Sequence, residues 1–165
     1  MIDRRILDEL QSNGRLSIVE LANRVHLTKT PCSERVRRLE KQGIISGYCA
    51  TVDTALIGLG HVTIVHVSLA QTGDNALDEF NKAVNLIPEI ETCLMIAGQF
   101  DYMLKVRTKD IAHFRELVGE KIGKLPNLLQ THSFAVMETV KDKRDIHMVE
   151  LESGANSSAE LSNRN

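Results

Sequence analysis

The sequence predicts an α+β chain in which a helix-turn-helix unit of three short helices precedes a ferredoxin-like βαββαβ unit. Two observations predict this fold. Three runs with helical spacing of apolar residues precede Gly43. After residue 60, runs rich in Val and Ile alternate with helical runs in the order strand, helix, strand, strand, helix, strand. We expect the helical unit at 1–52, a linker at 53–60, the βαββαβ unit at 61–140 and a polar tail at 141–165.

The first two helices have recognisable ends. Apolar residues at helical spacing stop at Asn13-Gly14, which ends the first helix. The second helix begins with Ser17-Ile18-Val19-Glu20, a capping box. In such a box the Ser17 hydroxyl accepts the amide hydrogen of Glu20, and the Glu20 carboxylate accepts that of Ser17. We therefore expect a firmly capped second helix.

The third helix is expected from about Thr30 to Gln42. Pro31 suits its first turn, where a missing N–H costs nothing, and Gly43 ends the pattern. Its inward face is expected to carry Cys32, Val36 and Leu39.

The run from Ile44 to Val52 is rich in β-forming residues and is interrupted by Gly47. Two interpretations stay open, a wing of the helix-turn-helix unit or a strand that links the two domains.

The second half has its own periodicities. We expect strands at 62–70, 90–96, 102–108 and 129–140, and helices at 74–86 and after a capping Asp110. The strand at 102–108 alternates cleanly, so that Tyr102, Leu104 and Val106 share one side. The expected core residues of the two helices are Leu77, Phe80, Val84, Ile87, Ile111, Phe114, Leu117, Val118 and Ile122.

Composition excludes several classes of protein. There is no run of eighteen apolar residues, so we expect no membrane span, and the first residues lack the apolar stretch of a secretory signal. Cys32, Cys49 and Cys93 form no CxxC pair, which favours a reducing cytoplasm over a disulfide framework or a zinc ribbon. The tail from about residue 152 is polar and lacks aromatic residues, which predicts disorder.

No metal site, cofactor or catalytic centre is expected. The six histidines are scattered, and no carboxylate or cysteine lies at ligand spacing from them. There is no GxSxG motif and no glycine-rich phosphate loop. An enzyme on the βαββαβ unit remains an alternative only because that fold hosts many activities.

Charge is unevenly divided along the chain. The net charge is -2, but residues 1–52 hold nine Lys/Arg and six Asp/Glu and are therefore basic. A basic head on an acidic body suggests a polyanionic partner at one end only.

The outward face of the third helix has the composition of a DNA recognition surface. Long cations contact phosphates or guanine edges, while Ser and Thr permit close approach in the major groove. Alone, this face would equally suit a solvated helix. Three helices in series, a capped second helix and a tight turn before the basic helix favour double-stranded DNA. The expected DNA-binding residues are Thr28, Thr30, Ser33, Glu34, Arg37, Arg38 and Lys41.

Six ordered motifs extend over roughly residues 2–143. They are Ile2–Gln11, Gly14–Ser17, Glu20–Ala22, Thr30–Glu40, Gly43–Tyr48 and Gly98-Gln99-Phe100-Asp101-Tyr102. Together they resemble the bacterial Lrp/AsnC family, the transcription regulators of the leucine-responsive and asparagine-synthetase type. Members of that family usually have several more residues before the first helix.

The resemblance implies a winged helix-turn-helix DNA-binding domain and a βαββαβ sensor domain that binds an effector and assembles subunits. Such regulators are cytoplasmic and nucleoid-associated, dimerise through the sheet and often form octamers. Their effectors are typically amino acids, bound between neighbouring subunits. The implied effector-binding residues are Met95, Ala97, Gly98, Gln99, Phe100, Asp101, Tyr102, Ile111, Phe134, Ala135 and Val136.

The chemistry of these residues suits an α-amino acid. Gly98 permits a positive φ and close backbone approach, Asp101 accepts from an ammonium group, and exposed turn amides take a carboxylate. The apolar members favour an apolar side chain. Alternatives stay open: 98–101 as a plain β-turn, Met95, Phe134 and Val136 as core or dimer interface, and the whole chain as an architectural DNA-packing protein without an effector.

Overall fold

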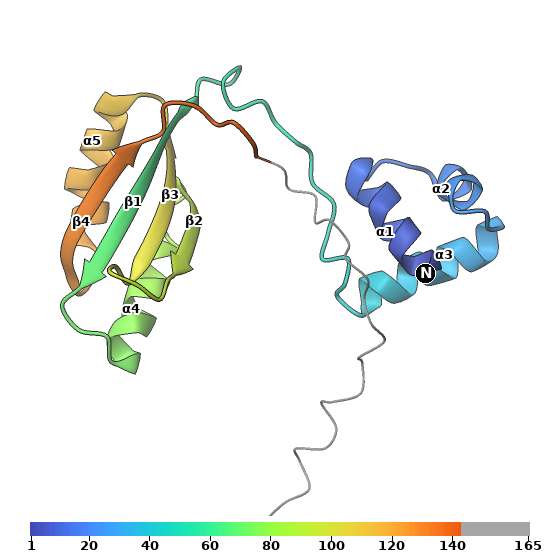
Figure 1. Ribbon diagram of the computed structural model, residues 1–165, viewed down its shortest axis with the longest axis horizontal. Coiled ribbons are helices and arrows are strands. Elements are labelled where there is room, and N and C mark those ends of the chain that lie inside the picture. Colours follow the sequence, from blue (N-terminus) through green and yellow to red (C-terminus); the bar gives the residue numbers. More distant parts are fainter. Residues whose placement is uncertain (143–165) are drawn as a thin grey trace, which may run out of the picture. The chain divides into compact units, whose positions relative to one another are not determined.

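The computed structural model describes residues 1–142, which divide into two compact units, Met1–Thr51 and Val52–Val140 (Figure 1). We call them the helical unit and the βαββαβ unit and treat each by itself. The disorder expected from residue 152 lies outside the described residues.

The helical unit consists of α1 (Ile2–Ser12), α2 (Ile18–Arg24) and α3 (Lys29–Lys41). Its helices share one apolar cluster, because each contributes one stripe of buried side chains. The inward face predicted for α3 is confirmed. The buried residues are Ile6, Leu7, Leu21, Ala22, Val25, Cys32, Val36 and Leu39.

The ends of these helices follow the sequence signals. The Ser17 amide donates to the Glu20 carboxylate at 2.9 Å, and the Glu20 amide donates to the Ser17 hydroxyl at 3.2 Å. The side-chain hydrogen bond from Ser17 lowers the pKa of Glu20, so the cap contributes stability at neutral pH and loses it as the pH falls through that lowered pKa. Gly43 follows α3 with φ of 71°, a left-handed conformation that favours glycine.

The β-rich run at 44–52 forms no strand. A strand needs a partner for its backbone groups, and none of residues 1–142 pairs with this run. The segment is instead held by Tyr48, whose hydroxyl donates to Glu40 at 3.0 Å. A Cβ on Gly14 would lie 3.3 Å from the Tyr48 ring, so Gly14 allows this close packing. Within residues 1–142 of one chain the run therefore forms neither a wing strand nor a linking strand.

The βαββαβ unit has the predicted element order. It contains β1 (His61–Leu69), α4 (Asp74–Val84), β2 (Ile90–Met95), β3 (Tyr102–Thr108), α5 (Ile111–Glu120), a 3-10 turn (Ile122–Lys124) and β4 (Leu128–Ala135). The four strands form one antiparallel sheet in the order β2-β3-β1-β4. β4 ends before the expected residue 140, because β1 begins at His61 and offers no partner beyond the Val136 amide, which bonds the Val62 carbonyl at 2.9 Å.

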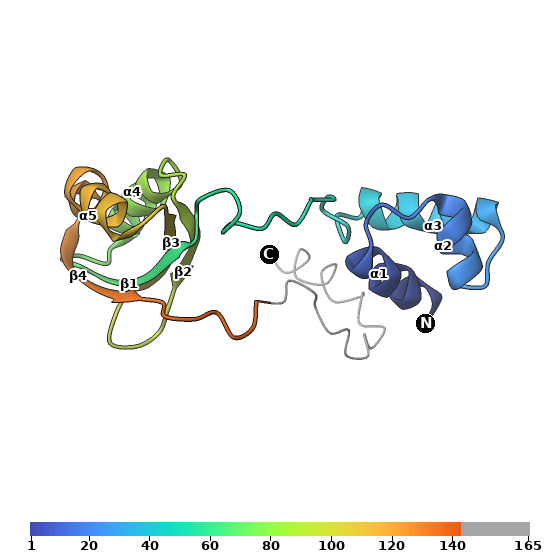
Figure 2. The ribbon, with the colours of Figure 1, turned by 90° about the horizontal axis from the view of Figure 1, so that it is seen from above.

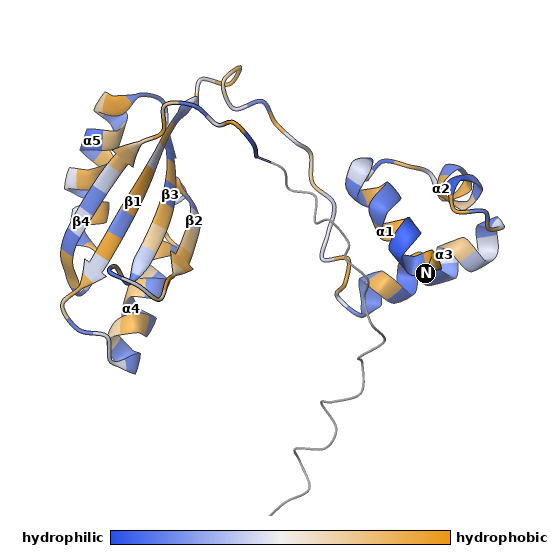
Figure 3. Cartoon of the chain, in the orientation of Figure 1, coloured by the Kyte–Doolittle hydropathy of each residue, from blue (hydrophilic) through white to orange (hydrophobic). Residues whose placement is uncertain are grey.

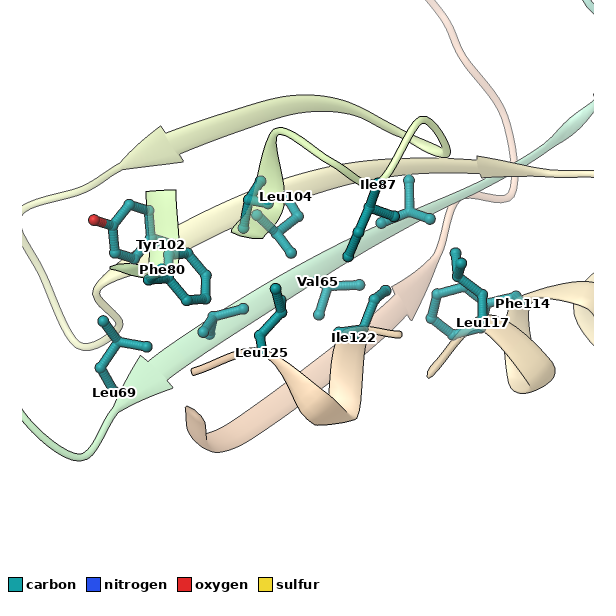
Figure 4. Packing of buried hydrophobic residues seen from close by; sticks show 13 residues of the cluster. Val65, Leu69, Phe80, Ile87, Tyr102, Leu104, Phe114, Leu117, Ile122 and Leu125 are labelled. Carbon is teal, nitrogen blue, oxygen red and sulfur yellow. The ribbon is translucent and has the colours of Figure 1, made fainter. Parts of the chain in front are cut away.

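Both α4 and α5 cover the same face of the sheet (Figure 2). The core between them includes Phe80, Leu104 and Phe114, and Figure 4 shows these side chains converging from the helices and strands. β3 alternates as predicted, with Tyr102, Leu104, Val106 and Thr108 buried. Along the strands, hydrophobic and hydrophilic residues follow one another in Figure 3. One core prediction was wrong, because Ile111 at the start of α5 is 60% exposed.

Within the βαββαβ unit, no helix or strand covers the opposite face of the sheet, which we call the open face. Aromatic side chains gather on it. The ring centroid of His66 lies 4.6 Å from that of Phe100 and 5.1 Å from that of Phe134, while Phe100 lies 5.4 Å from His132. Phe134 is nevertheless 52% exposed.

The expected linker at 53–60 is fastened to the βαββαβ unit. The Arg107 guanidinium donates to the Thr54 hydroxyl at 2.9 Å and to the Leu59 carbonyl at 3.0 Å, and it pairs with the Glu91 carboxylate. The Arg107 side chain is 14% exposed. These residues therefore belong to the second unit and do not form a loose connection.

Replacing Ser17 by Ala tests the capping box. We expect a loss of about 1 kcal/mol of stability in the helical unit, because the amide of Glu20 loses its acceptor and Glu20 loses its hydroxyl partner. Urea unfolding combined with hydrogen exchange of the α2 amides measures it. Ser12→Ala is the control, since that exposed hydroxyl only donates to a helical carbonyl. Equal effects of both substitutions would contradict the assignment.

Candidate nucleic-acid interface and effector site

The structure places the predicted DNA-binding residues on one side of α3. Thr30, Glu34, Arg37, Arg38 and Lys41 are exposed, opposite the buried face of the helix. Ser33 is half-buried, and Thr28 is the N-cap residue of α3 without a side-chain capping bond. The exposed set thus presents cations and small hydroxyls together on one helix.

Two of the cations of α3 are engaged within the helical unit. Arg38 pairs with Asp3 of α1 at 2.5 Å, and Arg35 pairs with the other oxygen of the same carboxylate at 2.8 Å. The Asp3 carboxylate therefore ties α1 to α3. Sequence reasoning missed Arg35 and Asp3, because partners more than thirty residues apart leave no local signal.

Arg37 differs from its neighbour Arg38 in α3. It is exposed and makes no ion pair with any of residues 1–142. Its guanidinium is therefore available to a phosphate without breaking an internal contact.

The 96–101 loop connects β2 to β3 and is anchored to β1. The Asp101 amide donates to the Val67 carbonyl at 2.9 Å, and the Asp101 carboxylate accepts from the Leu69 amide at 2.7 Å. The Ile96 amide donates to the Asp101 carbonyl at 2.9 Å, which closes the loop. One oxygen of Asp101 thus has a structural role that the sequence did not reveal.

The tip of this loop is open. Ala97, Gly98 and Gln99 are exposed, and no atom lies within 4 Å of a Cβ built on Gly98. Gly98 does not adopt the positive φ that glycine permits, since the glycines with positive φ within residues 1–142 are Gly43 and Gly58. Gly98 contributes unobstructed access to the backbone and does not supply a left-handed turn.

The apolar residues of the predicted effector site are not core. Met95 is 57% exposed and Phe134 is 52% exposed, so their interpretation as core residues was wrong. Ala135 is exposed and Val136 is half-buried. Exposed apolar side chains of this size suit an interface or a ligand contact.

Within one chain, the predicted effector residues extend from the 96–101 loop along the open face, since the rings of Phe100 and Phe134 both lie against His66. Tyr102 pairs with Val67, next to the anchored loop. Val136 bonds Val62, and β3 reaches the same end before Ile111. The five residue steps of β1 from Val62 to Val67 span roughly 17 Å, so the 96–101 loop and Val136 of one chain are too far apart to contact the same amino acid.

A metal site and a membrane-spanning helix can be assessed for residues 1–142 alone. No cluster of three metal-ligating side chains occurs among residues 1–142, and no helix there has the length and hydropathy to cross a bilayer. Burial raises the pKa of the Cys32 thiol, which suits a packing role.

Family models match both units. A model described as the Lrp/AsnC ligand binding domain matches residues 62–146, and a winged helix-turn-helix DNA-binding model matches residues 2–46. The chain belongs to the Lrp/AsnC family. The predicted fold class, a helix-turn-helix followed by an α+β domain of this type, is confirmed.

Relatives and solved structures agree with this assignment. The chain is 50% identical over 141 residues to the proline dehydrogenase transcriptional activator of Rhodobacter capsulatus, covering 86% of this chain and 92% of that protein. It is 44% identical over 140 residues to the leucine-responsive regulatory protein of Escherichia coli, covering 85% of each. Its relatives are regulators and not enzymes. This Lrp/AsnC protein is a DNA-binding transcription regulator.

Two solved structures match the whole fold. An AsnC family transcriptional regulator from Agrobacterium tumefaciens superposes with a TM-score of 0.85 at 28% identity, covering 88% of this chain and 95% of that one. A transcriptional regulator from Neisseria meningitidis in complex with L-methionine gives 0.84 at 30% identity, covering 88% and 94%.

Arg37→Ala tests the recognition face. We expect weaker binding to operator DNA and a log-log salt slope reduced by about 0.9, the value for one lost phosphate contact. Fluorescence anisotropy at several salt concentrations measures both. Arg115→Ala, which removes an exposed cation from α5, is the matched control. Unchanged affinity and slope for Arg37→Ala would exclude this face from the interface.

Proposed function

We propose that this regulator binds specific DNA sequences and that an amino-acid effector changes its assembly or its DNA binding. The distance along β1 between the 96–101 loop and Val136, together with the exposed apolar side chains of Met95 and Phe134, carries this proposal. A ligand that contacts the loop of one chain and Val136 of another lies between two subunits, so its binding would be coupled to the subunit arrangement. An effector acts by binding one arrangement better than another.

An amino acid fits the loop at 96–101. The uncommitted oxygen of Asp101 suits an ammonium group, and the exposed backbone around Gly98 suits a carboxylate. A regulator of Mycobacterium tuberculosis that is 29% identical has also been solved with L-methionine. These relatives support an amino acid as the class of effector for this chain.

The open face is the proposed dimer surface. It is an uncovered sheet face with exposed Phe134, and Nδ1 of His66 is buried without a hydrogen-bond partner among residues 1–142. A second copy would cover the aromatic side chains. We propose a homodimer that assembles further, as an octamer, in the cytoplasm and in association with the nucleoid.

DNA recognition is proposed to use Thr28, Thr30, Ser33, Glu34, Arg37, Arg38 and Lys41, with α3 in the major groove. Arg38 would act from its position beside Asp3, and Arg37 directly. The alternative, a DNA-packing protein without an effector, is distinguished by calorimetry with the twenty amino acids, since that alternative requires that none binds.

Asp101→Asn isolates the charge at the effector loop. The amide oxygen of Asn still accepts from the Leu69 amide, so the loop keeps its anchor while the ammonium loses its counter-charge. We expect amino-acid affinity to fall roughly 10- to 100-fold, the range for a lost charge-assisted hydrogen bond. Isothermal titration calorimetry measures it, with Asp74→Asn on exposed helix surface as the control. Unchanged affinity would remove Asp101 from the site.

Ile64→Glu tests the open face. Ile64 lies opposite Phe134 in the register of β1 and β4, so a buried carboxylate there would oppose dimer formation. We expect a shift to monomers in analytical ultracentrifugation and weaker DNA binding. Leu86→Glu, at an 82% exposed position after α4, is the apolar-to-acidic control. An Ile64→Glu protein with the unmodified assembly would place the dimer surface elsewhere.

A further inference from the structure

A pocket of about 380 Å³ lies on the helix side of the sheet, between the second half of α4 and the end of the β2–β3 pair. Its volume is within the range of small-molecule sites. Its lining residues are Asn81, Val84, Asn85, Cys93, Met95 and Tyr102. Met95 pairs with Tyr102 in the last rung before the 96–101 loop, so the pocket adjoins the proposed effector loop.

The pocket contains an unsatisfied donor. Tyr102 is 2% exposed, and its hydroxyl makes no hydrogen bond of good geometry among residues 1–142, although the Asn81 side chain lies near enough to lower its pKa. Figure 4 shows Tyr102 at one end of the core cluster, with its oxygen directed away from the cluster. A buried hydroxyl without a partner is unfavourable, and a ligand that supplies an acceptor removes that cost.

The other polar lining groups are neutral. Asn81 and Asn85 are one helical turn apart and so share a face of α4. The Asn85 side-chain nitrogen donates to the Asn81 carbonyl at 2.8 Å, which leaves the Asn85 side-chain oxygen as an acceptor. Val84, Cys93 and Met95 complete an apolar wall.

The surroundings disfavour a charged occupant. No Asp, Glu, Lys or Arg lines the pocket, so a buried charge would lack a counter-charge. Burial raises the pKa of the Tyr102 hydroxyl, the charges of Cys93, Asp101 and Asp78 raise it further, and the interaction with the Asn81 side chain lowers it by less than burial raises it. The hydroxyl therefore stays protonated as a donor, and the local field opposes anions.

We propose that this pocket receives the effector side chain and selects uncharged side chains that end in a hydrogen-bond acceptor, the carboxamide being the best match. The Tyr102 hydroxyl donates to the side-chain carbonyl, and the Asn85 oxygen accepts from the side-chain NH₂. The apolar wall contacts the methylene groups. This inference rests on the proposed amino-acid response and adds the residues that set its specificity.

The test uses the full-length protein and calorimetric titration with L-glutamine, L-asparagine, L-leucine and L-glutamate. Tyr102→Phe removes only the hydroxyl and keeps the ring against Phe80. We expect it to weaken the better-binding carboxamide amino acid 3- to 10-fold and to leave L-leucine within twofold, with L-glutamate the weakest ligand of the unmodified protein. Equal changes for the carboxamide and for leucine, or none, would overturn the inference.

Cysteine alkylation gives a readout that needs no substitution in the pocket. Cys93 lines the pocket and is half-buried, whereas Cys49 is exposed and lies in the other unit. We expect saturating carboxamide amino acid to slow maleimide labelling of Cys93 at least fivefold and to leave Cys49 unchanged. Equal labelling of Cys93 with and without ligand, or a Cys93 that is unreactive in the free protein, would overturn the pocket assignment.

The two proposals fail in different ways. Asp101→Asn could weaken the binding of every amino acid while Tyr102→Phe and Cys93 labelling show no dependence on the ligand side chain. That result would support the effector loop and contradict the pocket. If no amino acid binds the unmodified protein, the proposed amino-acid response is contradicted, and with it the pocket as a subsite for the effector side chain.

Discussion

Pairing of β1 with its two neighbours is the constraint on which the rest of the βαββαβ unit depends. β1 is central in the order β2-β3-β1-β4, and its Val67 and Leu69 backbone groups hold Asp101 at one end. At the other end of β1, the Val62 carbonyl accepts from the Val136 amide just after the last residue of β4. A one-residue slip in this register would exchange the core face for the open face. The geometry of the 96–101 loop and the exposed aromatic cluster therefore both depend on the pairing of β1 with β3 and β4.

The helical unit depends on ion pairs between its helices. Helices this short are marginal alone, so their arrangement comes from packing and from contacts between them. The Asp3 carboxylate binds both Arg35 and Arg38 of α3, and Glu9 pairs with Arg24 of α2 at 2.8 Å. The acidic side chains of α1 thus orient the two helices that follow and leave the outer cations of α3 to a partner.

Much of the fold could be predicted from the sequence, because periodicity and capping are local. The Ser17 capping box and the alternation along β3 are examples. What could not be predicted depends on distant partners. The segment at 44–52 had the composition of a strand without a neighbouring strand, and Ile111 had helical spacing on a turn that nothing covers. Several predicted site residues are exposed, among them Met95, Gly98 and Phe134, whereas Tyr102 is buried. The anchoring of Asp101 by the Leu69 amide could not be predicted, because the two residues are distant in the sequence.

The Arg107 contacts shorten the free connection between the two units. Tyr48 is held by Glu40 and Thr54 by Arg107, so the covalent path between these two fixed points contains only residues 49–53. The six Cα–Cα steps from Tyr48 to Thr54 span at most about 22 Å when fully extended. The effective length of the connection is therefore set by two side-chain contacts as well as by the number of residues, and loss of either contact would lengthen it without any insertion.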